Sequence, residues 1–349
     1  MSYLFLFAGL ALLIIGGDAL VRGAVSLAVR LNIPHLIIGL TIVALGTSAP
    51  ELLISIRAAF EGFPGLAVGN VVGSNIANIW LVLGVPALIS AICCDQKYIN
   101  HNLTFMLIAS LAFIGLCFLG PLTVWHGAIL VALLLAFLVD CYVRTKIHQK
   151  STAETSAHDE IADAGIDEDV EELIEQAEES ANEPAWKMLG FLALGMFALA
   201  IGAELTIDGA VQVAKAFNVS EATIGLTIVA IGTSLPELAA TVMAAYRGQP
   251  GLALGNAIGS NIYNIGAVLG ITALIAPIKI DPVFLEFDLW IMLLASLSIV
   301  PFVLFKAKIT KPIAVVFLLA YGTYIYKVID LGRAPISEQT QMINNAGAA

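Results

Sequence analysis

The chain has 349 residues, of which 59% are hydrophobic and 12% are charged, and its formal net charge is −11. Soluble globular domains contain roughly 25% charged residues, so a water-soluble fold of this composition would expose far more apolar surface than it could cover. The composition excludes an ordinary soluble protein, indicates an integral membrane protein, and gives no reason to expect a nucleic-acid partner.

Ten apolar segments are long enough to cross a bilayer, which requires about 20 residues of helix. In chain order they span residues 3–30, 36–60, 64–90, 101–119, 121–143, 187–216, 222–246, 250–276, 284–305 and 310–330. We therefore predict an all-α membrane protein with ten transmembrane helices.

An acidic segment, 144–186, separates the fifth span from the sixth and contains most of the acidic excess. It divides the chain into a first five-helix half, 1–143, and a second, 187–330, which is followed by a polar tail, 331–349. With the amino terminus outside, eleven of the 16 Lys and Arg residues fall on the inner side. The excess of basic residues on the cytoplasmic side of membrane proteins then predicts that both termini lie outside and that the acidic linker is cytoplasmic.

The two halves contain an internal repeat. Residues 38–84 align without a gap on residues 224–270, at a constant offset of 186 residues and with about two thirds of the positions identical. Because each half has five spans, an odd number, the second half must enter the membrane from the opposite side, as in the inverted repeats of secondary transporters. The substrate site is then expected near the midplane, where the two copies meet.

Each copy has a helix breaker inside an apolar span. Pro50 has no N–H to offer the carbonyl of Gly46, and Pro236 stands in the same relation to Gly232. Breaks in matching positions predict discontinuous helices, which we expect at the second, third, seventh and eighth spans. Backbone carbonyls freed in a bilayer need a partner, and a bound cation is one that satisfies several of them.

A glutamate follows each breaker directly: Glu51 in the first copy and Glu237 in the second. Ionisable residues at this depth are costly and usually functional. Two facing carboxylates provide a charge of −2, which suits one Ca²⁺ or at least two Na⁺ ions.

Further oxygen donors surround these glutamates in the sequence. The segments GNVVGSNIAN (69–78) and GNAIGSNIYN (255–264) each place a serine and an asparagine four residues apart, on one face of a helix. Together with the hydroxyls of GTS in each copy, the neutral donors are Thr47, Ser48, Ser74, Asn78, Thr233, Ser234, Ser260 and Asn264. Calcium takes six to eight hard oxygen ligands, whereas soft metals prefer the Cys and His that these segments lack.

The duplicated GTSxPEL and GNxxGSNxxN motifs resemble the two alpha-repeats of the sodium/calcium exchanger family, within the calcium/cation antiporter superfamily and most closely its prokaryotic members. The resemblance implies that Glu51 and Glu237 bind calcium together with the carbonyls of Thr47 and Thr233. It further implies that neighbouring sodium sites are completed by Ala44, Ser48, Ser74, Asn78, Ala230, Ser234, Ser260 and Asn264. Members of the family often have Asp at one of the positions matching Asn78 and Asn264, whereas here both are Asn.

These features predict an antiporter in the inner membrane of a prokaryote that exchanges Na⁺ for Ca²⁺ by alternating access. No cofactor is expected, and no HExxH motif or nucleophile set supports an enzyme. A proton/calcium antiporter and a passive cation channel remain as alternatives.

Asp18 and Glu204 occupy matching positions in the first and sixth spans. They either line an ion pathway or pair with Arg22 or another polar group.

Overall fold

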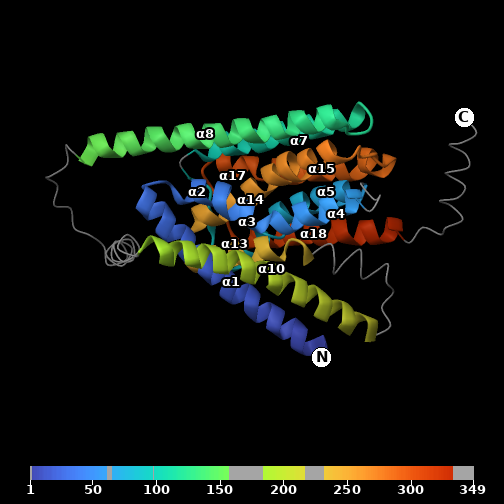
Figure 1. The fold of residues 1–349 in the computed structure, drawn as a ribbon, viewed down its shortest axis with the longest axis horizontal. Coiled ribbons are helices and arrows are strands. Elements are labelled where there is room, and N and C mark those ends of the chain that lie inside the picture. The colour runs from blue at the N-terminus through green and yellow to red at the C-terminus, as the bar shows by residue number, and fades with distance from the viewer. Residues whose placement is uncertain (1, 61–64, 97, 157–183, 217–231, 333–349) are drawn as a thin grey trace, which may run out of the picture.

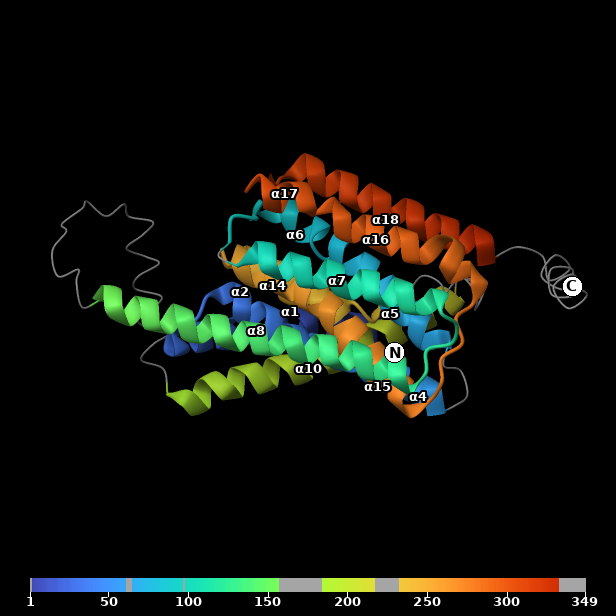
Figure 2. The same ribbon diagram turned by 90° about the horizontal axis from the view of Figure 1, so that it is seen from above.

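The computed structural model describes residues 2–60, 65–96, 98–156, 184–216 and 232–332. Within these ranges the chain is helical apart from two pairs of very short extended segments (Figures 1 and 2). In the first half the elements are α1 (Ser2–Leu31), α2 (His35–Ile38), η1 (Gly39–Val43), α3 (Ala44–Thr47), α4 (Ala49–Phe60), α5 (Gly65–Trp80), α6 (Gly84–Ile89), β1 (Ile92–Cys93), α7 (Ile99–Phe118) and α8 (Val124–Ser156). In the second half they are α10 (Ala185–Ala216), α13 (Leu235–Tyr246), α14 (Pro250–Tyr263), η3 (Asn264–Leu269), α15 (Gly270–Ile275), η4 (Phe284–Asp288), α16 (Leu289–Ser298), α17 (Val300–Leu304), β2 (Lys308–Ile309) and α18 (Lys311–Gly332).

Seven helices of the described chain are long and apolar enough to cross a membrane, and a bent pair of helices makes an eighth span. Helix α18 coincides with the tenth predicted span, and α13 with the second part of the seventh, whose first part lies outside the described residues. Helix α8 runs on to Ser156, well beyond the predicted end of the fifth span, so the beginning of the acidic segment continues that helix.

The spans that contain the duplicated GNxxGSN motif form the centre of the molecule. In the most apolar stretch of each span, 83% of the residues of Pro250–Ile275 and 72% of those of Leu66–Ile89 are buried, against 33% in α1 and in α10. Helices α1, α8 and α10 instead expose large apolar side chains, such as Phe7, Trp125 and Phe197, as expected of a surface that faces lipid.

The second span is broken where the sequence predicts it. The segments His35–Thr47 and Ala49–Phe60 meet at Ser48 with a bend of 42°. This junction lies between Gly46 and Pro50, because the proline cannot donate a hydrogen bond to the glycine carbonyl. In the second copy Pro236 lies in the first turn of α13, which begins directly after a turn at residues 233–234. The third span is interrupted at residues 81–83, and the eighth contains the π-helical turn η3.

Helices α1 and α10 lie side by side in antiparallel orientation (Figure 1) and pack through glycines at intervals of seven residues. They are Gly9, Gly16 and Gly23 in α1 and Gly195, Gly202 and Gly209 in α10. A Cβ atom at Gly202 would lie 2.9 Å from the backbone nitrogen of Leu13 and 3.0 Å from the carbonyl oxygen of Gly9. The two backbones therefore approach each other more closely than any larger residue permits, the arrangement that small residues give to membrane helices.

Two backbone pairings link the halves. Ile92 pairs with Ile309 and Cys93 with Lys308 in an antiparallel ladder that precedes α7, and Leu122 pairs with Ile278 after α7 ends. Because α7 has 20 residues and rises about 1.5 Å per residue, the two pairings lie roughly 30 Å apart along it.

Gly202→Ala should destabilise the protein, because its new Cβ meets backbone atoms of α1 that cannot rotate away. Overpacking of this kind costs about 1–3 kcal/mol. Gly190→Ala on the same helix is the matched control, since a Cβ there has no described atom within 4 Å. Thermal melting in detergent should show a lower Tm for Gly202→Ala alone; equal melting of the two variants would contradict the close approach of α1 and α10.

Candidate functional site

Eleven of the twelve predicted site residues lie in the described part of the chain, and all eleven are buried. Their exposed fractions do not exceed 7%; the residues are Ala44, Thr47, Ser48, Glu51, Ser74, Asn78, Thr233, Ser234, Glu237, Ser260 and Asn264. Ala230 lies outside the described residues.

The two copies meet at their glutamates. The hydroxyl of Ser48, at the break in the first copy, donates a hydrogen bond of 3.3 Å to Oε1 of Glu237 in the second. Glu51 follows Ser48 by three residues, at the start of α4, and α4 packs against both α5 and η3. The two carboxylates are 0% and 1% exposed, so both lie within the protein rather than against acyl chains.

Many of the oxygen atoms at this site have no hydrogen-bond partner among the described residues. Eleven buried side-chain atoms are unpaired in this way, and eight of them belong to predicted site residues: both carboxylate oxygens of Glu51, Oε2 of Glu237, Oγ of Ser74, Ser234 and Ser260, and Oδ1 of Asn78 and Asn264. Buried polar atoms are nearly always paired in folded proteins, so such a concentration requires an explanation. All eight atoms are oxygens, which are the donors that hard cations take.

The charge of the site comes from its two glutamates. Within the described ranges no group of three or more His, Cys, Asp or Glu side chains could hold a metal ion. The remaining donors are therefore neutral amide, hydroxyl and carbonyl oxygens. Two carboxylates surrounded by neutral oxygens can balance one divalent or two monovalent ions without the soft ligands that select zinc or copper.

Four asparagines that we did not predict complete the polar centre: Asn70, Asn75, Asn256 and Asn261. The side-chain amide of Asn256 accepts a hydrogen bond of 3.2 Å from Thr47 Oγ1 and donates to Thr241 Oγ1, at 2.9 Å, and to the backbone oxygen of Glu237, at 3.3 Å. At the matching position Asn70 donates to Ser55 Oγ, at 3.3 Å. The signal was present in the sequence, since these asparagines recur in both copies of the GNxxGSN motif.

Asp18 pairs with two arginines. Its carboxylate lies 2.9 Å from Nε of Arg22, one turn along α1, and accepts two hydrogen bonds from Arg247, one of them from Nε at 2.6 Å. Arg247 directly follows α13, so this ion pair ties α1 to the helix whose first turn contains Glu237. Of the two predicted alternatives, pairing is correct for Asp18, whereas Glu204 is exposed on α10.

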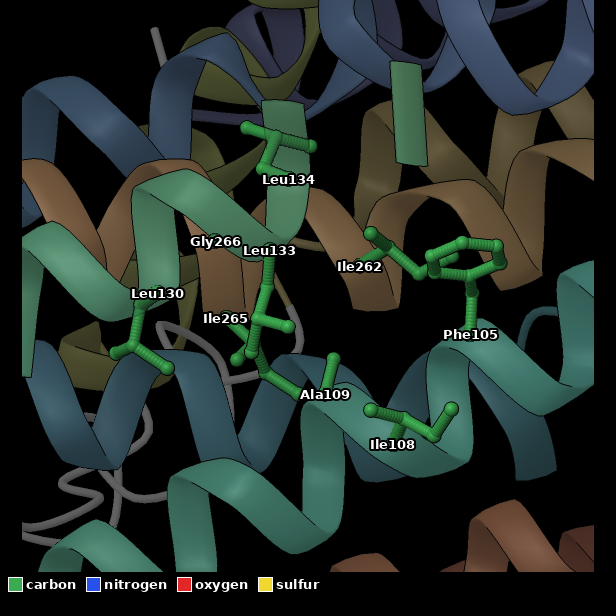
Figure 3. A pocket seen from close by; sticks show the side chains of 9 residues that line it. All are labelled: Phe105, Ile108, Ala109, Leu130, Leu133, Leu134, Ile262, Ile265 and Gly266. Atoms are coloured by element: carbon green, nitrogen blue, oxygen red, sulfur yellow. The ribbon is translucent and has the colours of Figure 1, made fainter. Parts of the chain in front are cut away.

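Two cavities lie beside the central helices. Figure 3 shows a small one, of about 10 Å³, which is enclosed by apolar side chains of α7 and α8 and by residues of α14 and η3. A larger cavity, of about 400 Å³, lies between the broken second span, η3 and the α10 residues Met196, Phe197 and Ala200. Ser48 forms part of its wall, so this apolar space reaches the candidate site.

The fold and the buried oxygen cluster define a multi-pass membrane protein of the ion-transporting class. The chain belongs to the sodium/calcium exchanger family, because the family model for sodium/calcium exchanger protein matches residues 1–143 and 187–329.

Several similar proteins carry the names of antiporters or exchangers. The chain is 39% identical to the putative antiporter CaxA of Alkalimonas amylolytica over 85% of its own length and 88% of that protein. It is 33% identical to the sodium/calcium exchanger MaX1 of Methanosarcina acetivorans over 93% and 97%, respectively. A solved structure of the sodium–calcium exchanger NCX_Mj, soaked with Na⁺ and Sr²⁺, superposes with a TM-score of 0.75 at 31% identity and covers 93% of this chain and 97% of that one.

Asp18→Asn and Arg247→Gln should have non-additive effects on thermal stability, because each removes the same ion pair. The coupling is expected to reach at most about 1 kcal/mol, since both side chains are partly exposed to solvent or lipid headgroups. Arg22→Gln is the control and should couple more weakly with Asp18→Asn, as 52% of the Arg22 side chain is exposed. Additive shifts in Tm for the Asp18–Arg247 pair would show that it does not hold α1 to α13.

Proposed function

We propose that this chain exchanges Na⁺ for Ca²⁺ across the inner membrane by alternating access, with the ions bound near the midplane by Glu51 and Glu237. The observation that supports this most strongly is the cluster of eight unpaired buried oxygens on the predicted site residues. Membership of the sodium/calcium exchanger family supports the same pair of ions.

In this proposal calcium binds to the two carboxylates and to the backbone oxygens of Thr47 and Thr233. The neighbouring sodium sites use Ala44, Ser48, Ser74, Asn78, Ala230, Ser234, Ser260 and Asn264. The two copies then contribute residues at matching positions to these sites.

We also propose that the architecture is ten helices in two inverted repeats. The pairings on either side of α7 support it. Ile92 of the first half pairs with Ile309, and the residue that matches Ile92 in the second half, Ile278, pairs with Leu122. Residue 122 matches residue 308, so the same two segments meet twice, at opposite ends of α7. A rotation about an axis in the membrane plane accounts for both contacts.

Exchange rather than leak follows from the charge of the site. Without a cation, two adjacent carboxylates in a low-dielectric interior face a severe desolvation penalty, so the apolar helices α1 and α10 can pass the site only when bound ions neutralise it. The cavity beside Ser48 gives α10 space to move relative to the broken second span.

A proton/calcium antiporter is the second candidate, because a glutamate in an apolar site can release and accept protons. Against it, none of the five histidines falls within the repeated segments, and the hydroxyl-rich surroundings are suited to Na⁺. A passive channel would have to conduct through this site without a counter-ion.

The transported Ca²⁺ and Na⁺ ions are the substrates, and the lipid bilayer is the surrounding medium. The distribution of Lys and Arg supports an orientation with both termini outside and with the segment 144–186 in the cytoplasm.

Glu51→Gln and Glu237→Gln should each abolish calcium uptake driven by a sodium gradient in proteoliposomes, because one remaining carboxylate cannot balance a divalent ion. Glu286→Gln is the control: it removes an exposed carboxylate at the start of the ninth span and should leave uptake unchanged. Uptake retained in either site variant would contradict the proposed roles.

Replacing sodium by choline at constant pH should stop calcium uptake in the wild-type protein. The physical reason is that choline is too large and has no bare charge to offer the oxygen cluster. Calcium-45 flux measured with sodium, potassium and proton gradients imposed separately distinguishes the candidates. Uptake driven by the proton gradient alone would favour the proton antiporter, and flux without any counter-ion gradient would favour a channel.

A further inference from the structure

We propose that Asn75 and Asn261 are positioning residues that hold the side-chain amides of Asn264 and Asn78 with their oxygens toward the transported ions. This inference rests on the proposed function, since it concerns how that site presents its ligands. Neither Asn75 nor Asn261 is itself among the predicted ion ligands.

The four asparagines form a reciprocal set of hydrogen bonds across the two copies. Asn264 Nδ2 donates to Asn75 Oδ1 at 3.0 Å, and Asn78 Nδ2 donates to Asn261 Oδ1 at 3.1 Å. Each bond joins one copy to the other, and each has its counterpart at the matching positions. All four side chains are buried, with exposed fractions of 0–1%.

Backbone carbonyl groups determine which way the side-chain amides of Asn75 and Asn261 are turned. Asn75 Nδ2 donates to the carbonyl oxygen of Asn261 at 3.4 Å, and Asn261 Nδ2 donates to that of Asn75 at 3.2 Å. A carbonyl oxygen only accepts, so the NH₂ of each positioning residue must face it. The same NH₂ groups lie near a methionine sulfur, Met292 for Asn75 and Met106 for Asn261, and these methionines also occupy matching positions.

The orientation is then passed on to the ligands. Because the NH₂ of Asn75 bonds the carbonyl oxygen of Asn261, the Oδ1 atom of Asn75 faces Asn264. An oxygen of this kind only accepts, so Asn264 must turn its NH₂ group toward it. Oδ1 of Asn264 is left over and has no hydrogen-bond partner among the described residues, and the same holds for Asn78. An amide that rotated by half a turn would present NH₂ to a cation, and the contact would become repulsive.

The arrangement also accounts for asparagine at both ligand positions. An ionised aspartate at 264 would place an oxygen where Nδ2 now lies, facing Asn75 Oδ1, and two acceptors would oppose each other. The positioning pair is therefore matched to neutral amides, and the charge of the site is provided by Glu51 and Glu237.

The experiment combines variants across the two pairs. Asn75→Leu should raise the sodium concentration for half-maximal thermal stabilisation of the purified chain about tenfold, because Asn264, a proposed sodium ligand, loses the partner that orients it. In an Asn264→Asp background, Asn75→Leu should leave that concentration unchanged or lower it, since either carboxylate oxygen can face the ion. In an Asn78→Asp background the full loss should remain. The mirror-image set, Asn261→Leu with Asn78→Asp, should behave in the same way.

A role in packing alone predicts another pattern. Asn75→Leu would then weaken binding equally in the wild-type, Asn264→Asp and Asn78→Asp backgrounds, and that result would overturn the inference, as would unchanged binding in Asn75→Leu itself. Asn75→Ser, which is smaller, replaces the leucine variant if the latter does not give monodisperse protein.

Flux measurements separate this inference from the proposed function. If the wild type carries sodium-driven calcium flux but Asn75→Leu has the same effect in the Asn264→Asp and Asn78→Asp backgrounds, the proposed function stands and the positioning role is wrong. If sodium binding depends on the background in this way but the wild type carries no sodium-driven calcium flux, the positioning role stands and the proposed function is wrong.

Discussion

Two carboxylates buried beside each other in a membrane are the constraint on which this structure depends. Glu51 and Glu237 are at most 1% exposed. Ser48, three residues before Glu51 in the first copy, donates a hydrogen bond to Glu237 in the second. Transferring even one isolated carboxylate into such a medium is prohibitive unless it is protonated or paired with a cation. The broken helices, the unpaired hydroxyls and the oriented amides are all consistent with pairing to cations, because each adds oxygen acceptors and none adds positive charge.

The repeat explains why a short motif can build such a site. Several contacts of one copy have a counterpart in the other: Asn256 with Thr241 matches Asn70 with Ser55, and the asparagine pairs match each other. The symmetry is not complete, since Ser48 donates to Glu237 whereas Oγ of the matching Ser234 has no hydrogen-bond partner among the described residues. It also fails at the first and sixth spans. Asp18 pairs with Arg22 on α1, but the residues matching these two are Glu204 and Asp208, which are exposed on α10 and cannot form an ion pair. The two ends of the transporter therefore differ in charge, although its centre is duplicated.

Much of the site could be predicted because the physics that defines it is local. A proline removes one helical hydrogen bond and favours a kink or break wherever it lies in a helix, and the bend at Ser48 lies between Gly46 and Pro50. Asn75 and Asn261 were missed because their partners lie in the other copy, 183 to 189 residues away, and spacing on one helix does not reveal contacts between helices. Asn70 and Asn256 were missed because they bond side chains of the preceding helix in their own copy, at a separation of 15 residues. The extension of α8 to Ser156 was missed for a related reason: a helix that leaves the membrane continues in polar sequence, where hydropathy gives no signal. The glycines between α1 and α10 recur every seven residues in the sequence, but only the structure shows that each set lies against the backbone of the other helix.

The glycines between α1 and α10 and the central asparagine network bear on the proposed mechanism, in which a rigid site coexists with a moving helix pair. The glycines let α1 and α10 approach each other closely, and the buried face of α1 packs on the core through apolar side chains such as Leu20 and Val21. Among the described residues, Asp18 adds an ion pair from α1 to Arg247. The central asparagines instead join the two copies by hydrogen bonds that are buried and directional. In the proposed cycle, directional hydrogen bonds lie where ligand geometry must persist, and non-directional apolar packing lies where helices must slide. In the proposed mechanism, coupling between ions and motion resides in the charge of the site, which α1 and α10 can cross only after cations have neutralised it.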